Sequence, residues 1–203
     1  YSGSYIPEQP KLGYKICEKI VRQNFLEFTD PFTLKIISLP DSKINEFHDF
    51  ILENKPKMVL LISPDNPTSK VLSNEFVTGA LEAAIEIGSF LVIDYAYKEL
   101  VFDDAYPQYY SWGPNDNFIS LRSNSKWGRG LGRRLGWIEA PDFVVESMES
   151  IQNSTILCPD MLHQMAMTEY INKSISRNTL LPYIKEVNKQ YHTAAKQTVK
   201  SIN

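Results

Sequence analysis

Residues 58–97 read MVLLISPDNPTSKVLSNEFVTGALEAAIEIGSFLVIDYAY and alternate between short apolar runs and one amphipathic segment. The two apolar runs, Met58–Ile62 and Phe90–Ile93, have the length and composition of parallel strands that are buried on both sides. Between them, apolar residues recur at helical spacing from about Ser73 to Gly88, a residue that commonly ends helices. The segment therefore predicts a strand, a helix and a second strand. The helix should pack through Phe76, Ala80, Ala84 and Ile87.

The flanking sequence extends the same alternation. It predicts strands at residues 33–39 and 118–121, a helix that starts near Asp41, and a short basic helix at 15–24. Three further helices are predicted at residues 141–153, 159–175 and 178 to the end. Alternating strands and helices are typical of an α/β fold with a mostly parallel sheet. We therefore expect a three-layer α/β large domain at residues 1–150 and a helical segment at 151–203.

Composition narrows the classes of protein to consider. The 203 residues are 43% hydrophobic and 22% charged, which is ordinary for a soluble globular protein. A net charge of -3 gives no basic surface for nucleic acid, so no nucleic-acid partner is expected. No apolar run reaches the roughly 18 residues of a membrane span. The two cysteines, Cys17 and Cys158, make no disulfide framework and favour a reducing compartment, which we interpret as the cytoplasm.

Polar residues follow two of the predicted strands. Asn66 comes shortly after the first strand, and Asp94 and Tyr97 close the second. Ligands of open α/β sheets bind at the carboxyl ends of such strands. Each residue has an ordinary alternative role, because Asp-Asn-Pro is a common turn sequence and aspartate often caps or ends an element.

A second group of polar residues follows the strand at 118–121. It contains Ser123, Ser125 and Lys126, and Arg134 lies eight residues beyond the lysine. A neutral amine can hold an aldehyde cofactor, and arginine with serine hydroxyls can hold a phosphate. Pyridoxal 5′-phosphate (PLP) would engage both groups, because Asp94 would face its ring nitrogen and Asn66 and Tyr97 its phenolic oxygen.

Other interpretations carry less weight. Lys126 considered alone is more often a solvated surface lysine. The glycines at 128, 130 and 132 do not open a strand–helix unit with a downstream acidic residue, so they are a weak nucleotide-binding pattern. The aromatic residues Tyr109, Tyr110 and Trp112 are more often packing than a substrate pocket. No metal site is expected, because the three histidines lack the spacing of metal ligands.

With these motifs the chain resembles the class I/II aminotransferases, which are fold-type-I PLP-dependent enzymes. The resemblance rests on Asn-Pro-Thr at 66–68, Asp-x-x-Tyr at 94–97, Ser-x-Ser-Lys at 123–126 and Arg-Leu-Gly-Trp at 134–137. It implies that Lys126, Asp94 and Tyr97 are catalytic, with Lys126 forming the Schiff base. It further implies that the cofactor is bound by Asn66, Asp94, Tyr97, Ser123, Ser125, Lys126 and Arg134.

The resemblance also implies a function in amino acid metabolism. The expected reaction is transfer of an amino group between an L-amino acid and a 2-oxo acid, in a homodimer. The alternatives are a PLP-dependent lyase of the carbon–sulfur or cyclopropane-forming type, and a non-catalytic remnant of the fold. Family members are considerably longer and have Gly where this chain has Ser69. We therefore expect this chain to be a fragment, centred on the large domain, or a reduced protein.

Overall fold

The computed structural model describes residues 41–66, 69–102, 106–130, 132, 134–158 and 160–202, with side chains from residue 44 onward. Its strands are β1 (Met58–Ile62), β2 (Phe90–Asp94), β3 (Phe118–Ser123) and β4 (Gly136–Glu139). Its α-helices are α2 (Asp41–Asn54), α3 (Asn74–Glu86), α4 (Asp142–Thr155), α5 (Met161–Ser176) and α6 (Leu180–Ile202). The expected helix at 15–24 and strand at 33–39 lie outside the described residues.

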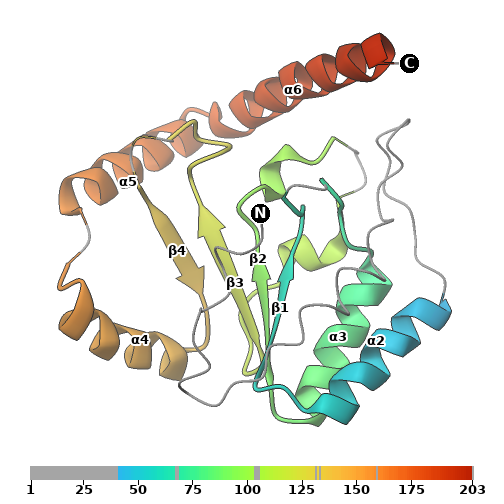
Figure 1. The fold of residues 1–203 in the computed structure, drawn as a ribbon. Helices are drawn as coiled ribbons and strands as arrows, with labels where there is room; N and C mark the ends of the chain where they lie inside the picture. The colour runs from blue at the N-terminus through green and yellow to red at the C-terminus, as the bar shows by residue number, and fades with distance from the viewer. Residues whose placement is uncertain are drawn as a thin grey trace.

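The sheet has the order β1-β2-β3-β4. The β1–β2 and β2–β3 pairs are parallel and the β3–β4 pair is antiparallel, so the sheet is mostly parallel as expected. Figure 1 shows α2 and α3 on one side of this sheet, and α4 on the other. In the same view α5 and α6 pass along the end at which β1, β2 and β3 finish. The α/β class and the helical carboxy-terminal segment are therefore confirmed.

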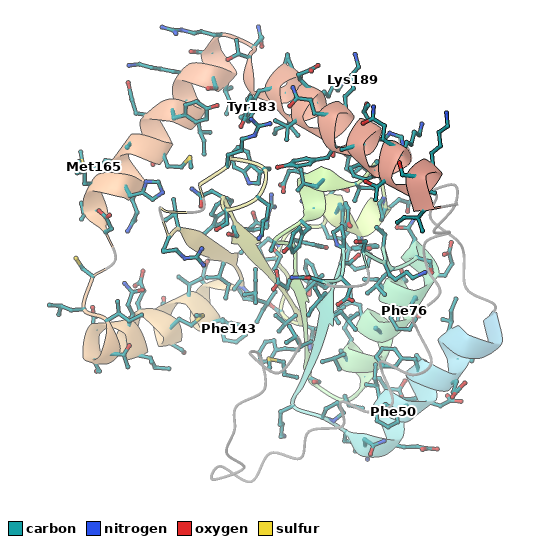
Figure 2. All side chains as sticks on the ribbon, turned by 45° about the horizontal axis from the view of Figure 1, so that its top comes forward. Phe50, Phe76, Phe143, Met165, Tyr183 and Lys189 are labelled. Carbon is teal, nitrogen blue, oxygen red and sulfur yellow. The ribbon has the colours of Figure 1, made fainter. Side chains whose placement is uncertain are left out.

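The hydrophobic core lies between the sheet and the α2–α3 layer. Every second strand residue points to this side, and Leu91, Ile93 and Phe118 are completely buried there. The rings of Phe47 and Phe76 stack at 4.7 Å between their centroids and join α2 to α3. On the opposite side, the ring of Phe143 in α4 lies 6.2 Å from that of Phe90. Figure 2 shows Phe50 and Phe76 on one side of the sheet and Phe143 on the other.

One sequence prediction about the sheet was wrong, and one strand was missed. Met58–Ile62 was expected to be buried on both sides, but its burial alternates and Met58 is 56% exposed. β1 has a strand neighbour only at β2 within the described residues, so it is an edge strand there. β4 was not predicted as a strand, because four residues that begin with glycine carry too short a pattern. The expected domain boundary at residue 150 falls inside α4 and remains a prediction.

Ser73 caps α3. Its hydroxyl accepts a hydrogen bond from the Phe76 N–H at 3.2 Å, and its own side chain is buried. Ser73→Ala is expected to lower the free energy of unfolding by about 1 kcal/mol, because this amide loses its partner. Urea denaturation followed by circular dichroism measures the change. Ser147→Ala provides a matched control, because the exposed Ser147 hydroxyl bonds the Phe143 carbonyl within its own helix. An equal loss in both variants would contradict the capping role.

Candidate active site

The site lies at the carboxyl ends of the parallel strands. The Ser63 amide donates to the Asp94 carbonyl at 3.2 Å, and the Tyr95 amide donates to the Leu121 carbonyl at 2.9 Å. These bonds continue the ladders of β1, β2 and β3 past their ends. The chain segments that carry Asn66, the Asp94–Tyr97 group and the Ser123–Lys126 group therefore all leave the sheet at the carboxyl ends of its parallel strands, referred to below as the carboxyl edge.

Asp94 is a buried carboxylate at this edge, with only 8% of its surface exposed. Its Oδ1 accepts a hydrogen bond from the Ala96 amide at 2.9 Å. Burial raises the pKa of Asp94 above its ordinary value, and the Ala96 hydrogen bond opposes this effect. Within the described residues no cationic side chain pairs with it. Asp94 is thus desolvated without a counter-charge, which is a costly state for a carboxylate.

Tyr97 brings two other predicted site residues together. The Asn66 amide nitrogen donates to the Tyr97 hydroxyl at 3.2 Å. The Lys126 Nζ lies 5.1 Å from the centroid of the Tyr97 ring, within the range of a cation–π contact. An amide, a phenol and an amine from three separate segments therefore meet at one place. The neighbours Pro67 and Thr68 of the Asn-Pro-Thr motif lie outside the described residues.

The predicted phosphate-binding residues form a second cluster. The Ser123 hydroxyl donates to the Ser125 hydroxyl at 3.0 Å and accepts from the Ser125 amide at 3.2 Å. Arg134 Nη1 lies 3.5 Å from the Ser125 hydroxyl. Because Lys126 follows Ser125 directly, this cluster adjoins the cluster around Tyr97. The structure brings two hydroxyls and a guanidinium together next to the lysine.

Asn124 was missed by sequence reasoning, although it sits in the middle of the Ser-x-Ser-Lys motif. Its side chain is completely buried, and its amide nitrogen lies 3.3 Å from Nε2 of His163 in α5. Its Oδ1 has no hydrogen-bond partner in the part of the chain that the structure describes. A Cβ on Gly130 would come within 2.8 Å of the Asn124 side-chain nitrogen, and one on Gly128 within 2.9 Å of the Asn124 backbone carbonyl oxygen. Both glycines therefore pack directly on Asn124.

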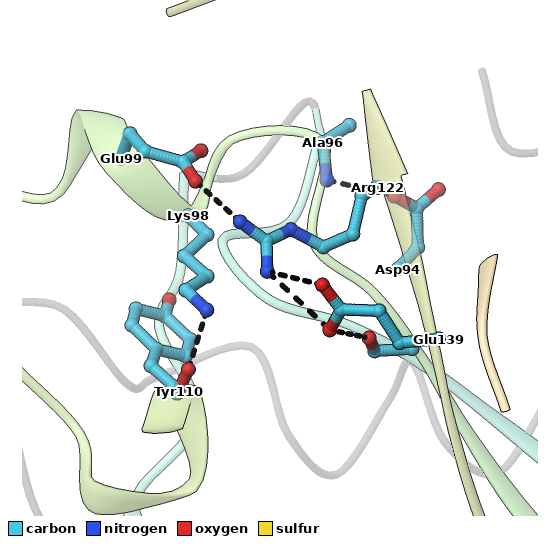
Figure 3. Close-up of polar contacts among 8 residues, drawn as sticks. Asp94, Ala96, Lys98, Glu99, Tyr110, Arg122 and Glu139 are labelled. Atoms are coloured by element: carbon cyan, nitrogen blue, oxygen red, sulfur yellow. Dashed lines mark hydrogen bonds and ion pairs between the residues drawn. The ribbon is translucent and has the colours of Figure 1, made fainter. Parts of the chain in front are cut away.

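A charged network on the other side of the sheet was also missed. Arg122 Nη2 bonds Glu99 at 2.8 Å, and Arg122 Nη1 bonds Glu139 at 3.2 Å, as Figure 3 shows. The Ser120 hydroxyl donates to the same Glu139 carboxylate at 2.7 Å. Lys98 Nζ donates to the Tyr110 carbonyl nearby, and burial, then the charge of Arg122, lower the pKa of Lys98.

The aromatic loop at 109–112 and the basic residues that follow Lys126 were the other candidates for a binding site. Tyr109 and Tyr110 are buried in the hydrophobic core, and the Trp112 ring packs on Phe118, so this aromatic loop packs rather than opening a pocket. The Arg129 guanidinium bonds Gln190 of α6 at 3.1 Å, and Arg133 lies outside the described residues. No group of three metal-ligating side chains gathers within the described ranges. None of the helices in the same ranges has the length and apolar character needed to cross a bilayer.

The side chains at this edge fit PLP by their chemistry. PLP carries an aldehyde, a protonatable ring nitrogen and a phosphate, which require an amine, a carboxylate and a cation with hydroxyl donors. Lys126, Asp94 and Arg134 supply the charged groups, and none has an oppositely charged partner among the described residues. Unpaired charges of both signs at one edge are expected where a ligand completes the pairing.

The comparisons with known proteins all find aminotransferases. The model of the family "Aminotransferase class I and II" matches residues 38–203. Aspartate aminotransferase of Pyrococcus abyssi is 26% identical over 164 residues, which cover 79% of this chain and 40% of that protein. Histidinol-phosphate aminotransferase 2 of Archaeoglobus fulgidus is 35% identical over 104 residues, 51% of this chain and 28% of that protein. The crystal structure of Thermotoga maritima aspartate aminotransferase superposes with a TM-score of 0.57 at 27% identity, covering 63% of this chain and 34% of that one.

These relatives are longer proteins. The chain spans less than half the length of the curated relatives that it matches. The family match nevertheless covers most of this chain and every candidate site residue. Aminotransferases of classes I and II depend on PLP, in agreement with the cofactor that the sequence predicts. The chain belongs to the class I and II aminotransferase family.

Proposed function

We propose that the chain forms the cofactor-binding part of a PLP-dependent aminotransferase that moves an amino group between an L-amino acid and a 2-oxo acid. The observation that carries the proposal is the meeting of Asn66, Tyr97 and Lys126 at the carboxyl end of the sheet, the end at which the buried Asp94 also lies. The names of the matched relatives, which include aspartate and histidinol-phosphate aminotransferases, support the reaction class.

Each side chain has a distinct part in holding the cofactor. Lys126 would bind the aldehyde carbon through its amine, and Asp94 would keep the ring nitrogen protonated. Asn66 and Tyr97 would donate to the phenolic oxygen. The phosphate would be held by Ser123, Ser125 and Arg134. When bound, PLP supplies an electron sink for the charge that develops on the substrate Cα.

Lys126 would also move the proton in the reaction. Once the substrate amine has displaced it, its free amine would act as general base on the Cα proton. Tyr97 would orient that amine, because the two groups already lie 5.1 Å apart. Asp94, held by the Ala96 amide, would keep its charge directed at one position. These roles require Lys126 to be the only covalent attachment point.

The assembly and location of the whole protein are also proposals. The resemblance implies a homodimer that acts on small amino acid and 2-oxo acid substrates, and the use of cysteine favours the cytoplasm. Residues 151–203 would lead from the large domain, at residues 1–150, toward a smaller carboxy-terminal domain. The helical character of α5 and α6 supports the last point.

Cofactor attachment gives the direct test of the proposed function. The purified protein is incubated with PLP, reduced with borohydride and digested, and the labelled peptide is identified by mass spectrometry. We expect an absorbance band in the visible region that disappears on reduction, with the label on Lys126. Incubation with an amino acid and a 2-oxo acid should then yield the exchanged pair. Release of thiol or of an unsaturated product would indicate a lyase. Cofactor binding without turnover in the full-length protein would indicate a non-catalytic remnant.

A further inference from the structure

One guanidinium connects three of the chain segments that carry the site. Arg122 belongs to β3 and directly precedes Ser123, the first of the predicted phosphate-binding residues. Its partner Glu99 lies in the short 3-10 helix Lys98–Leu100, which begins one residue after Tyr97. Its partner Glu139 ends β4, the strand that begins two residues after Arg134. The segments that lead to Tyr97, Lys126 and Arg134 are therefore joined through Arg122.

Arg122 does not reach the site itself. Leu121 is the sheet partner of Asp94, so these two residues point to the same side of the sheet. Arg122 is the next residue and points to the opposite side, where its guanidinium lies 5.7 Å from the Trp137 ring centroid. Arg122 can therefore act on the geometry of the site through the backbone of the segments that it joins.

The connection is partly withdrawn from solvent. The side chains of Arg122 and Glu99 are each 16% exposed, and that of Glu139 is 35% exposed. Water screens such a pair less than one on an open surface, and loss of one member leaves a poorly solvated charge on the other. The forked guanidinium can bond two carboxylates at fixed angles, which a lysine amine cannot do. The two ion pairs of Arg122 therefore tie the three segments to one another.

We propose that Arg122, held by Glu99 and Glu139, is a positioning residue that sets Tyr97 against Lys126 and Asn66 for cofactor binding, an inference that rests on the proposed function. Shifting Glu99 would move the segment that starts at Tyr97. Shifting Arg122 would move the segment that runs through Ser123 to Lys126. The Asn66–Tyr97 hydrogen bond at 3.2 Å and the Lys126–Tyr97 contact at 5.1 Å would both change.

The test compares variants of the full-length protein. Arg122→Met removes the charge at similar volume, and Glu99→Gln keeps the shape of its side chain while removing the negative charge. Glu169→Gln is the matched control, because Glu169 pairs with Lys173 at 2.9 Å on an exposed face of α5. PLP is titrated into each variant to give Kd. The pH midpoint of the visible absorbance of the bound cofactor is measured separately, and circular dichroism reports folding.

A positioning role predicts three results. Arg122→Met should weaken PLP binding by roughly tenfold to a hundredfold, the size expected of a small misplacement of binding groups. Glu99→Gln should weaken it less, and the double variant should lose no more than Arg122→Met alone, because both changes break the same connection. Both single variants should shift the pH midpoint, because the partners of the phenolic oxygen have moved. Glu169→Gln should match the unmodified protein in Kd and midpoint.

The outcomes separate this inference from the proposed function. If Glu99→Gln and every folded Arg122 variant keep the unmodified Kd and pH midpoint, the positioning role is wrong. A weaker Kd with an unchanged midpoint indicates a contribution to stability alone and also overturns it. Should Arg122→Met fail to fold, the Glu99→Gln variant decides the question. If the unmodified protein forms no PLP band, the proposed function fails and this inference fails with it.

Discussion

Replacing Lys126 by alanine is expected to abolish covalent attachment of PLP and to lower the transamination rate by at least roughly 10²–10⁴-fold, the contribution typical of a general base. The fold should survive, because the half-buried Lys126 amine contacts the Tyr97 ring and makes no ion pair among the described residues. The free energy of unfolding should therefore change by less than about 1 kcal/mol, the size of an exposed cation–π contact. Borohydride labelling, turnover and urea denaturation measure the three quantities.

Lys98 supplies the sharpest control for this prediction. It is the other lysine near the end of β2, and burial lowers its pKa below the ordinary value. Lys98→Met should nevertheless retain the borohydride label, because the Lys98 amine is bonded to the Tyr110 carbonyl on the Arg122 side of the sheet. A label that persists in Lys126→Ala and disappears in Lys98→Met would show that Lys98, and not Lys126, carries the cofactor.

Replacing Asp94 by asparagine is expected to change stability and catalysis in opposite directions. Without the carboxylate, turnover should fall on the order of 10²-fold or more, because a preorganised charge no longer stabilises the transition state. The cofactor-free protein should become more stable at neutral pH, because the variant no longer buries an unpaired negative charge. The amide oxygen of asparagine can still accept the Ala96 hydrogen bond at 2.9 Å.

The stability gain should depend on pH in a defined direction. Burial raises the pKa of Asp94 above its ordinary value of 3.8, so the folded protein binds this proton more tightly than the unfolded chain does. The stability of the unmodified cofactor-free protein should therefore fall as pH rises from the ordinary value through the raised one. The advantage of Asp94→Asn should be absent below the ordinary value and complete above the raised one.

Urea denaturation of cofactor-free protein across this pH range tests the prediction. Asp116→Asn serves as control, because Asp116 is exposed in a turn and its replacement should stay within about 0.5 kcal/mol. A destabilised Asp94→Asn variant at neutral pH would show that the carboxylate already has a favourable partner without PLP. With saturating PLP the unmodified protein should become more stable than Asp94→Asn, because the charged ring nitrogen would then pair with the Asp94 carboxylate.

Local patterns in the sequence were sufficient for much of the fold. The strand–helix–strand unit at 58–94 was predictable because its periodicity and its helix stop lie within the segment itself. β4 was not, because Gly136–Glu139 becomes a strand only by pairing with β3. The exposure of Met58 was equally hidden, because a strand's place in the sheet depends on its neighbours rather than on its own residues.

Some contacts of the candidate site could be predicted from the sequence, and others could not. The meeting of Asn66 with Tyr97 follows from two strand ends that share one edge of a parallel sheet, which the motif order implies. The Asn124–His163 contact spans 39 positions, and the Arg122–Glu99 bond spans 23. No local pattern marks these partners, since each pairing depends on where a later helix or strand comes to lie. The domain boundary, the homodimer and the individual roles of the site residues remain predictions.

The crowding around Asn124 has a consequence for mutational tolerance. Alanine at position 128 or 130 would place its methyl group against Asn124, and alanine at position 136 would place one within 2.9 Å of the Arg122 carbonyl oxygen. Gly113 and Gly132 have open space at the same position. Tolerance to substitution in this part of the chain is thus limited by missing atoms as well as by reactive ones, because a side chain at position 128, 130 or 136 would meet neighbouring atoms.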